Sequence, residues 1–277
     1  MYSNMLGKNS LKLFDVTLRD GLQSLTKIYS LAEKTEILRN IIVNRYPSAI
    51  EVGSIVSPKI LPQMSESIEL FHEAQFINII IARPIDLYML TPNLKSVNIA
   101  SDHNITNFSF ITSVSNAFQK KNTNKNLTEI KNEIELMMKR VTLIQDSKVK
   151  LYISCITDCP ISGKIDNHKI INEILHYYYT YDEISEICLS DTCGTMEFNN
   201  FKTIIDELLK RNVDFNKISL HLHNQENKQN VKDIIIYGMK SGIYRFDVSD
   251  MPEIGGCSVT MENPSGNLSY DDVKRCL

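Results

Sequence analysis

Short apolar runs alternate along the chain with longer stretches in which apolar residues recur at helical spacing. The runs of strand length lie at 11–18, 49–54, 87–91, 106–112, 148–155, 183–190, 217–223 and 245–249. The stretches of helical period lie at 30–44, 61–75, 93–101, 127–145, 166–179, 198–211 and 226–240. Alternation of strand and helix predicts a parallel sheet with helical crossovers. Eight such strands within 277 residues favour an α/β fold of the (β/α)8 type, a TIM barrel, over an open sheet.

Two segments fall outside this alternation. Residues 76–83 (FINIIIAR) are strand-like, and we interpret them as part of the approach to the third strand. Residues 120–126 (KKNTNKN) are polar, which predicts a loop rather than a linker between domains. Neither segment divides the repeat, so residues 1–277 are expected to form a single barrel domain.

Composition and charge exclude several classes of protein. Apolar residues make up 43% and charged residues 23% of the chain, which is typical of a globular domain. The 30 basic and 33 acidic residues give no reason to expect a nucleic-acid or membrane-surface partner. The first ten residues, MYSNMLGKNS, lack the apolar core of a secretory signal and the pattern of a transit peptide. Six cysteines are too few for a disulfide scaffold, so we expect a cytoplasmic protein.

In a barrel of this type the active site lies where the carboxyl ends of the strands meet. The first strand runs into Arg19, Asp20 and Gly21, where an acid could ligate a cation and the arginine could face a substrate oxyanion. A simple Asp-Gly turn is the alternative. His221 and His223 end the seventh strand and share one face, because residues i and i+2 of a strand do. Two such imidazoles are half of a divalent-metal site, or else a hydrogen-bonded pair in the core.

The segment after the eighth strand adds two candidates. Gly255 and Gly256 permit backbone shapes closed to other residues. Cys257 follows them and could give or take a proton, since a thiol titrates nearer neutrality than a hydroxyl. Asn267 offers a neutral oxygen ligand. Taken singly, each of these is more simply explained as an ordinary loop residue.

Two acids near the ends of the second and sixth strands, Glu51 and Asp191, complete the set. Both would point into the mouth of the barrel and hold the histidines or Arg19 in place, or they would be structural salt-bridge partners. The chain has no Gly-x-Gly-x-x-Gly, no Walker-type Gly-Lys-Ser/Thr and no Gly-x-Ser-x-Gly. That removes the commonest nucleotide-binding and hydrolase functions.

Together these residues resemble a known family, the metal-dependent lyases and Claisen-type enzymes with Arg-Asp-Gly at the first strand. Within it the chain is most similar to the 3-hydroxy-3-methylglutaryl-CoA (HMG-CoA) lyases. The matching stretches agree in order and spacing through nearly the whole chain: RDGLQS (19–24), SIVSPKILPQM (54–64), LTPNLK (90–95), KKN (120–122), YISCITDCPISGKI (152–165), SDT (190–192), HLH (221–223), IGGC (254–257) and SGNL (265–268).

The resemblance implies a lyase that cleaves an acyl-CoA in the retro-Claisen sense, giving acetyl-CoA and acetoacetate from HMG-CoA. It implies a divalent cation, Mg²⁺ or Mn²⁺, held by four ligands: Asp20, His221, His223 and Asn267. It also implies that Arg19 stabilises the developing enolate oxygen and that Cys257 is the acid or base on a mobile loop. Glu51 and Asp191 would then be supporting polar residues.

The chain departs from the family pattern in three places. The His-x-His is followed by NQENKQN without the family's glycine, and the run before GGC is DMPEI. Only residues 268–277 follow SGN, which predicts a shortened C-terminal helix region and favours a homodimer that covers the last strand. Two alternatives stay open beside the active lyase. One is a related enzyme that condenses acetyl-CoA with a 2-oxo acid, or an aldolase. The other is an inactive descendant that binds a ligand or partner.

Overall fold

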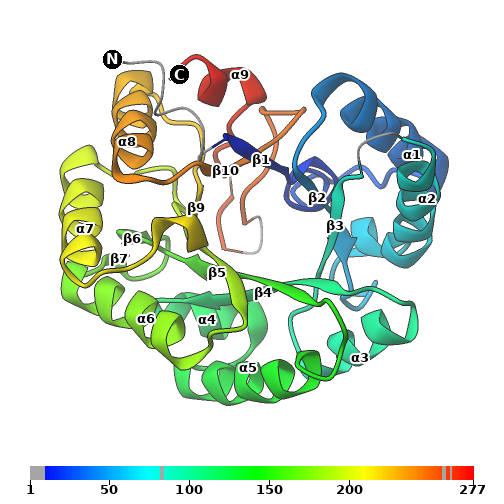
Figure 1. Ribbon diagram of the computed structural model, residues 1–277, viewed down its shortest axis with the longest axis horizontal. Helices are drawn as coiled ribbons and strands as arrows, with labels where there is room; N and C mark the ends of the chain where they lie inside the picture. Colours follow the sequence, from blue (N-terminus) through cyan, green and yellow to red (C-terminus); the bar gives the residue numbers. More distant parts are fainter. Residues whose placement is uncertain (1–9, 82–83, 258–259, 263) are drawn as a thin grey trace.

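The computed structural model describes residues 10–81, 84–257, 260–262 and 264–277. Eight parallel strands close into a barrel in the order β1-β10-β9-β8-β5-β4-β3-β2, with the helices outside it (Figure 1). The barrel strands are β1 (Lys12–Asp15), β2 (Ala49–Ser54), β3 (Asp86–Leu90), β4 (Asn107–Ser113), β5 (Lys148–Ser154), β8 (Ile184–Ser190), β9 (Ile218–His221) and β10 (Arg245–Val248). The predicted (β/α)8 barrel is thereby confirmed.

The outer layer is helical. Its α-helices are α1 (Leu31–Asn40), α2 (Ser67–Ile80), α3 (Leu94–Asp102), α4 (Asn116–Thr123), α5 (Leu127–Val141), α6 (Asn167–Thr180), α7 (Phe198–Lys210), α8 (Lys228–Ser241) and α9 (Tyr270–Lys274). Shorter elements are the helical turns η1 (Thr17–Gly21), η2 (Ile41–Arg45), η3 (Pro62–Met64) and η4 (Phe215–Lys217), and a hairpin of β6 (Asp158–Cys159) and β7 (Gly163–Lys164). Within the described ranges, no helix combines the length and apolar character needed to cross a membrane.

Side-chain caps set where several of these helices begin. The side chains of Ser30, Asn93, Asn126 and Ser269 each accept a hydrogen bond from the backbone N–H three residues on, and the side chain of that residue accepts one from the backbone N–H of the cap residue. Such reciprocal caps satisfy N–H groups that a helix cannot satisfy internally. Short polar residues therefore mark the strand-to-helix boundaries that the alternation pattern predicts.

The expectation for residues 76–83 is wrong in the part that the structure describes. The helix α2 runs on to Ile80, and residues 82–83 lie outside the described ranges. Phe76 and Ile79 are 61% and 83% exposed, so neither apolar side chain is buried as it would be in a barrel strand. Asn78 ties the end of the helix to the start of β3, because its amide both donates to and accepts from the backbone of Ile85 at 2.8 Å. A short apolar run does not by itself distinguish strand from helix.

The loop expected at 120–126 is also shorter than the sequence predicts. Residues 120–123 belong to α4, which begins after Ser115, whose hydroxyl accepts from the Phe118 N–H. Asn124 ends the helix with a φ of 57°, a left-handed conformation that asparagine tolerates. Only residues 124–126 connect α4 to α5. The prediction of a longer loop failed because lysine and asparagine are as compatible with a solvated helix as with a loop.

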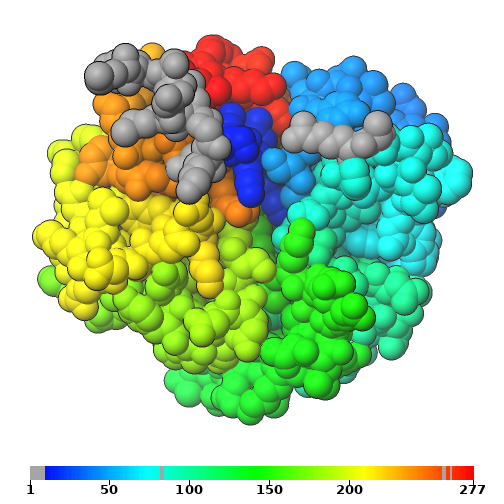
Figure 2. Space-filling model, viewed as in Figure 1, coloured from blue at the N-terminus to red at the C-terminus, as the bar shows by residue number. Residues whose placement is uncertain are grey.

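The C-terminal helix α9 has five residues. It nevertheless packs against the barrel, since Tyr270 and Val273 are buried. The Tyr270 hydroxyl donates to the Asp15 carboxylate at 2.7 Å, at the end of β1. Figure 2 shows this segment in red close to the N-terminal strand in blue. The helix α9 is thus anchored beside the end of β1.

Candidate active site

The first strand ends earlier than the sequence predicts, and a helical turn takes its place. β1 stops at Asp15, and η1 carries Arg19 and Asp20 into the mouth of the barrel. The Asp15 carboxylate accepts from the Thr17 N–H at 2.9 Å and so starts this turn. Arg19 and Asp20 are 6% and 4% exposed, which rules out the alternative of a surface turn.

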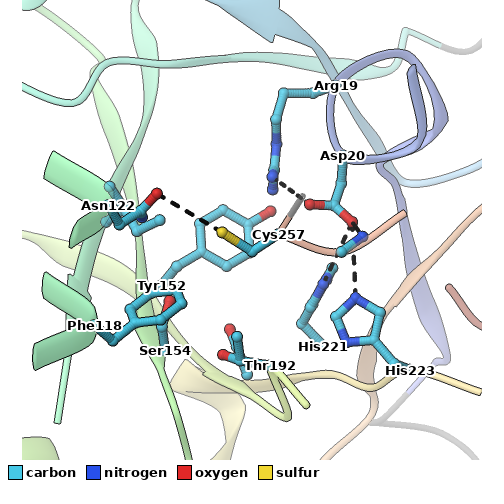
Figure 3. A pocket seen from close by; sticks show the side chains of 13 residues that line it. Arg19, Asp20, Phe118, Asn122, Tyr152, Ser154, Thr192, His221, His223 and Cys257 are labelled. Atoms are coloured by element: carbon cyan, nitrogen blue, oxygen red, sulfur yellow. Dashed lines mark hydrogen bonds and ion pairs between the residues drawn. The ribbon is translucent and has the colours of Figure 1, made fainter. Parts of the chain in front are cut away.

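Asp20, His221 and His223 meet at one point. One potential ligand atom from each lies within 4.8 Å of the others. The Asp20 Oδ2 atom is 3.9 Å from His221 Nε2 and 3.8 Å from His223 Nε2 (Figure 3). Asn267, far along the chain, donates from Nδ2 to the same Asp20 oxygen at 3.0 Å. All four predicted ligands are therefore side by side.

Both imidazole rings are held by their Nδ1 atoms. His223 Nδ1 lies 2.7 Å from the backbone carbonyl of Asp191, and His221 Nδ1 lies 3.1 Å from Asp247 Oδ2. A carbonyl and a carboxylate both accept, so each Nδ1 carries a proton and each Nε2 is the ring atom left to face the cluster. The rings are 4.8 Å apart.

The cluster fits a divalent cation. His223 Nε2 and Asn267 Oδ1 are buried, and neither has a hydrogen-bond partner in the part of the chain that the structure describes. A buried polar atom left without a partner is costly, and a cation between these atoms would satisfy both. One carboxylate, two imidazoles and one amide oxygen form a donor set suited to a divalent ion.

The charge state of the cluster is set by its neighbours. Burial alone would raise the pKa of Asp20, but Arg19 and the two histidines outweigh it and hold that pKa well below its usual value. Burial would likewise lower the pKa of Arg19, and the carboxylates of Glu51 and Asp20 raise it well above its ordinary range. An ionised carboxylate therefore faces the two Nε2 atoms.

Arg19 is fixed on three sides. Its Nε pairs with Glu51, its Nη1 pairs with Asp20 at 2.7 Å, and its guanidinium lies 5.2 Å from the centre of the Tyr152 ring. Glu51 is wholly buried in β2 and also lies 3.4 Å from the Tyr152 hydroxyl. The expectation that Glu51 holds Arg19 agrees with this geometry.

Cys257 lies on the segment between β10 and α9, which folds over the cluster. Gly255 and Gly256 have φ values of 139° and 79°, conformations that favour glycine. The Gly256 N–H donates to Asp20 at 2.8 Å. A Cβ atom on Gly255 would lie 2.2 Å from the Asn267 amide nitrogen. The double glycine is thus needed for the loop to reach the ligands.

A cavity of about 60 Å³ separates Cys257 from the cation cluster. It is lined by Arg19, Asp20, Ile111, Phe118, Asn122, Tyr152, Ser154, Ser190, Thr192, His221, His223, Gly256 and Cys257. The Cys257 sulfur points across it to the Asn122 amide oxygen, 3.8 Å away on α4 (Figure 3). Arginine, thiol and candidate ligands therefore share one space.

The side chain of Asp191 lies elsewhere than the sequence predicts. Its carboxylate accepts from the backbone N–H groups of Thr195 and Met196 and from the Gln225 amide. It caps the turn before α7 instead of entering the mouth. Asp191 still supports His223, but through its main-chain carbonyl. A main-chain contact of this kind cannot be predicted from the type of side chain.

Three residues of this site are missed by the sequence analysis: Asp247, Tyr152 and Asn122. Asp247 and Tyr152 lie inside strands, whereas the candidate residues predicted from the sequence lie near strand ends. A charged residue between two apolar residues of a strand, as in Phe-Asp-Val of β10, is the pattern that could have indicated Asp247. Asn122 appears only within the KKN motif and was assigned to a loop.

Comparison with known proteins bears directly on this arrangement. The model of the HMGL-like family matches residues 10–249, most of the chain. This protein belongs to the HMGL-like family. The chain is 28% identical over 267 residues to a 3-hydroxy-3-isohexenylglutaryl-CoA/hydroxymethylglutaryl-CoA lyase of Pseudomonas aeruginosa, covering 95% of this chain and 83% of that protein. It is also 28% identical over 262 residues to the human mitochondrial hydroxymethylglutaryl-CoA lyase, covering 95% and 76%.

Solved structures of HMGL-like relatives have the same fold. A hydroxymethylglutaryl-CoA lyase of Pseudomonas aeruginosa superposes with a TM-score of 0.82 at 27% identity, covering 96% of this chain and 84% of that one. An HMG-CoA lyase of Acinetobacter baumannii in complex with coenzyme A and 3-methylmalate gives a TM-score of 0.80 at 25% identity, covering 95% and 82%. The likeness therefore extends over the barrel as a whole.

Proposed function

We propose that this protein is a carbon–carbon lyase that cleaves HMG-CoA, or a related 3-hydroxyacyl-CoA, to acetyl-CoA and a 3-oxo acid. With HMG-CoA the second product is acetoacetate. The observation that carries the proposal is one cavity lined by Arg19, Cys257 and a carboxylate–imidazole cluster, in a chain of the HMGL-like family. Relatives named as lyases of this kind support the choice of substrate class.

The cluster would hold a divalent cation, Mg²⁺ or Mn²⁺, through Asp20, His221, His223 and Asn267. A bound cation would act as a Lewis acid toward the substrate's hydroxyl and carboxylate oxygens and lower the pKa of that hydroxyl. The protein's own contribution is orientation, because each imidazole is held by its Nδ1 and the carboxylate is held by Arg19.

Arg19 is the group placed to stabilise negative charge on the thioester oxygen. When the bond between C2 and C3 breaks, the hydroxyl proton is lost and an acetyl-CoA enolate forms. A guanidinium fixed by Glu51 and Tyr152 needs no reorganisation to meet that charge, so it stabilises the transition state more than the ground state.

Cys257 is the group placed to return a proton to the enolate carbon. Its sulfur faces the cavity across from Arg19, on a loop that covers the cluster (Figure 3). A general acid of this kind contributes about 10²–10⁴-fold to a rate. Closure of the same loop would also exclude water from the enolate. Glu51 and Asp191 act as supporting residues, Glu51 on Arg19 and Asp191 on His223.

The proposal also covers the domain organisation, the location and the oligomeric state. We propose a single domain, a cytoplasmic location and a homodimer in which a second subunit lies against the side of the barrel near α9. Sedimentation of the purified protein measures its mass in solution, and a monomer at every concentration would contradict the dimer.

The direct test is turnover. Purified protein supplied with Mg²⁺ or Mn²⁺ and HMG-CoA should yield acetoacetate and acetyl-CoA in equal amounts, and removing the cation with a chelator should stop the reaction. The variant Asp20→Asn should be folded and inactive. A metal-replete wild type that produces no acetoacetate would refute the proposal for this substrate.

The altered residues after His223 favour one alternative, an inactive descendant that binds a ligand or partner. A related condensing enzyme would consume acetyl-CoA together with a 2-oxo acid, so a panel of such acids separates it from the lyase. An inactive descendant would turn over neither set of substrates.

A further inference from the structure

A row of charged side chains runs through the interior of the barrel beneath the cation cluster. In order, the row is Arg245, Glu186, Lys150, Asp247 and His221. The Arg245 guanidinium is 3.0 Å from Glu186, and the Lys150 ammonium is 2.9 Å from the other Glu186 oxygen. Lys150 also pairs with Asp247, and it is wholly buried.

Stability alone gives no reason for this row. Removing an ammonium and a carboxylate from water costs several kcal/mol for each ion, and apolar residues of similar size are often as stable there. Lys150 sits 3.6 Å from the centre of the Phe14 ring, in surroundings that an apolar side chain would also fill. We therefore expect the charges to serve the end of the row that meets the active site.

At that end Asp247 has two different donors to satisfy. Its Oδ1 accepts from the Lys150 ammonium, and its Oδ2 accepts from His221 Nδ1 at 3.1 Å. Each carboxylate oxygen of Asp247 thus faces its own nitrogen donor, and the Cys188 thiol also lies 3.8 Å from Oδ2.

We propose that Asp247, anchored by Lys150, is the positioning residue of His221: it fixes the proton on Nδ1 and aims the Nε2 lone pair at the cation site. This inference rests on the cation site of the proposed function and adds a residue that the sequence analysis does not contain. A carboxylate behind a metal-binding histidine fixes its tautomer and orientation, and losing such a partner weakens metal binding by about 10–100-fold.

The second imidazole offers an internal comparison. His223 is oriented by the main-chain carbonyl of Asp191, at 2.7 Å, which no side-chain substitution removes. A change at Asp247 therefore disturbs one ligand of the pair and leaves the orienting contact of the other in place.

The variant that tests the role is Asp247→Asn. Lys150 and His221 Nδ1 contact different oxygens of Asp247, and in an asparagine one of these two positions is an NH2 group that donates. If the oxygen stays on the lysine, the amide donates to Nδ1 and moves the imidazole proton to Nε2, which blocks the lone pair. We expect Mn²⁺ affinity, measured by electron paramagnetic resonance on the whole protein, to fall about 10–100-fold.

The matched control is Glu186→Gln. It removes a carboxylate from the same lysine but leaves the Asp247–His221 contact intact, so Mn²⁺ affinity should stay within about twofold of wild type. A merely structural role for Asp247 predicts equal losses in the two variants, and that result would overturn the proposal. Wild-type Mn²⁺ affinity in a folded Asp247→Asn protein would overturn it as well.

A second measurement does not depend on any variant that might fail to fold. Nitrogen-15 spectra of the histidine rings in the cation-free wild type distinguish the two tautomers of His221. The proposal requires a proton on Nδ1, and an Nδ1 atom without a proton would overturn it.

These outcomes are separable from those of the proposed function. A wild type that binds Mn²⁺ with the expected tautomer but makes no acetoacetate supports this inference and refutes the reaction. A wild type that binds no Mn²⁺ refutes the cation site, and this inference with it.

Discussion

The two halves of the candidate active site are built differently. The cation cluster comes from η1, which follows β1, from the end of β9 and from Asn267 just before α9, and its residues are at most 5% exposed. Its imidazoles are each fixed by a hydrogen bond from behind. Cys257 lies on the loop between β10 and α9, is only partly buried, and reaches Asn122 across the cavity at 3.8 Å.

This difference separates two tasks. Strand ends in a packed barrel hold ligands at fixed distances, because their backbone is set by the sheet. A loop can admit a substrate and then cover it, but its geometry is less constrained. We therefore expect changes in the cluster to abolish cation binding, and changes at the thiol to spare binding and slow the chemistry.

The largest effect is expected from His223→Ala. Removing one ligand and its lone pair should weaken Mn²⁺ binding and lower turnover by roughly 10³-fold or more, since a Lewis acid supplies several kcal/mol of stabilisation. Binding is measured by titration and turnover by acetoacetate release. His168→Ala, at an exposed position on α6, is the control. Unchanged Mn²⁺ affinity in His223→Ala would contradict the expectation that the cluster holds the cation.

The next effect is expected from Cys257→Ser. A hydroxyl is a poorer proton donor than a thiol, so kcat should fall by about 10²-fold, the lower end of what general acids contribute. Mn²⁺ affinity should not change, because the thiol is no ligand in this arrangement. Cys276→Ser, in the C-terminal segment, controls for loss of a thiol. A parallel loss of Mn²⁺ affinity in Cys257→Ser would show that the two halves are not independent.

The two halves touch at Gly255, and Gly255→Ala measures how strongly. The new methyl group would lie 2.2 Å from the Asn267 amide nitrogen and 3.0 Å from Asp20. We expect about 1–3 kcal/mol of destabilisation from the backbone conformation and a roughly tenfold loss of Mn²⁺ affinity. Gly163→Ala is a matched control, since its φ is 74° and a Cβ there meets nothing within 4 Å. Equal Mn²⁺ affinity in both variants would contradict contact between the halves.

The smallest effect on turnover is expected from Asp15→Asn, which lies outside both halves. Burial raises the pKa of Asp15 to about 7, so the native state keeps a proton that the unfolded chain releases near its ordinary pKa of 3.8. This contribution to stability is present at low pH and is lost as the pH rises towards 7, with a slope of up to about 1.4 kcal/mol per pH unit.

Asparagine at position 15 does not ionise, so the variant should lack that slope. Urea unfolding at several pH values between 4 and 8 measures it as the difference between wild type and variant. A difference that does not depend on pH would mean that Asp15 is ionised in the native state.

Much of the fold was predictable, and the reason lies in the barrel's repetition. Each unit buries one strand and one helix face, so errors at single elements do not change the architecture. The errors at 76–80 and 120–123 share one cause: exposed isoleucines in α2 and solvated lysines in α4 carry no information about burial.

The site was predictable in its membership and only partly in its geometry. Asp20, His221, His223, Asn267 and Cys257 lie where the strand ends and the resemblance place them. Asp191 does not, because its carboxylate is committed to backbone N–H groups of the following turn. Asp247 could not be inferred from strand ends, since its role depends on a lysine that lies 97 positions away.

The pairing of β1 with β10 has a consequence for how the chain is made. Lys12 is aligned with Arg245, so β1 has to wait for the synthesis of β10 before its second neighbour exists. Contacts this distant in sequence slow folding and leave a strand edge exposed meanwhile. Until β10 is made the sheet stays open, and chaperones would be expected to guard its edge.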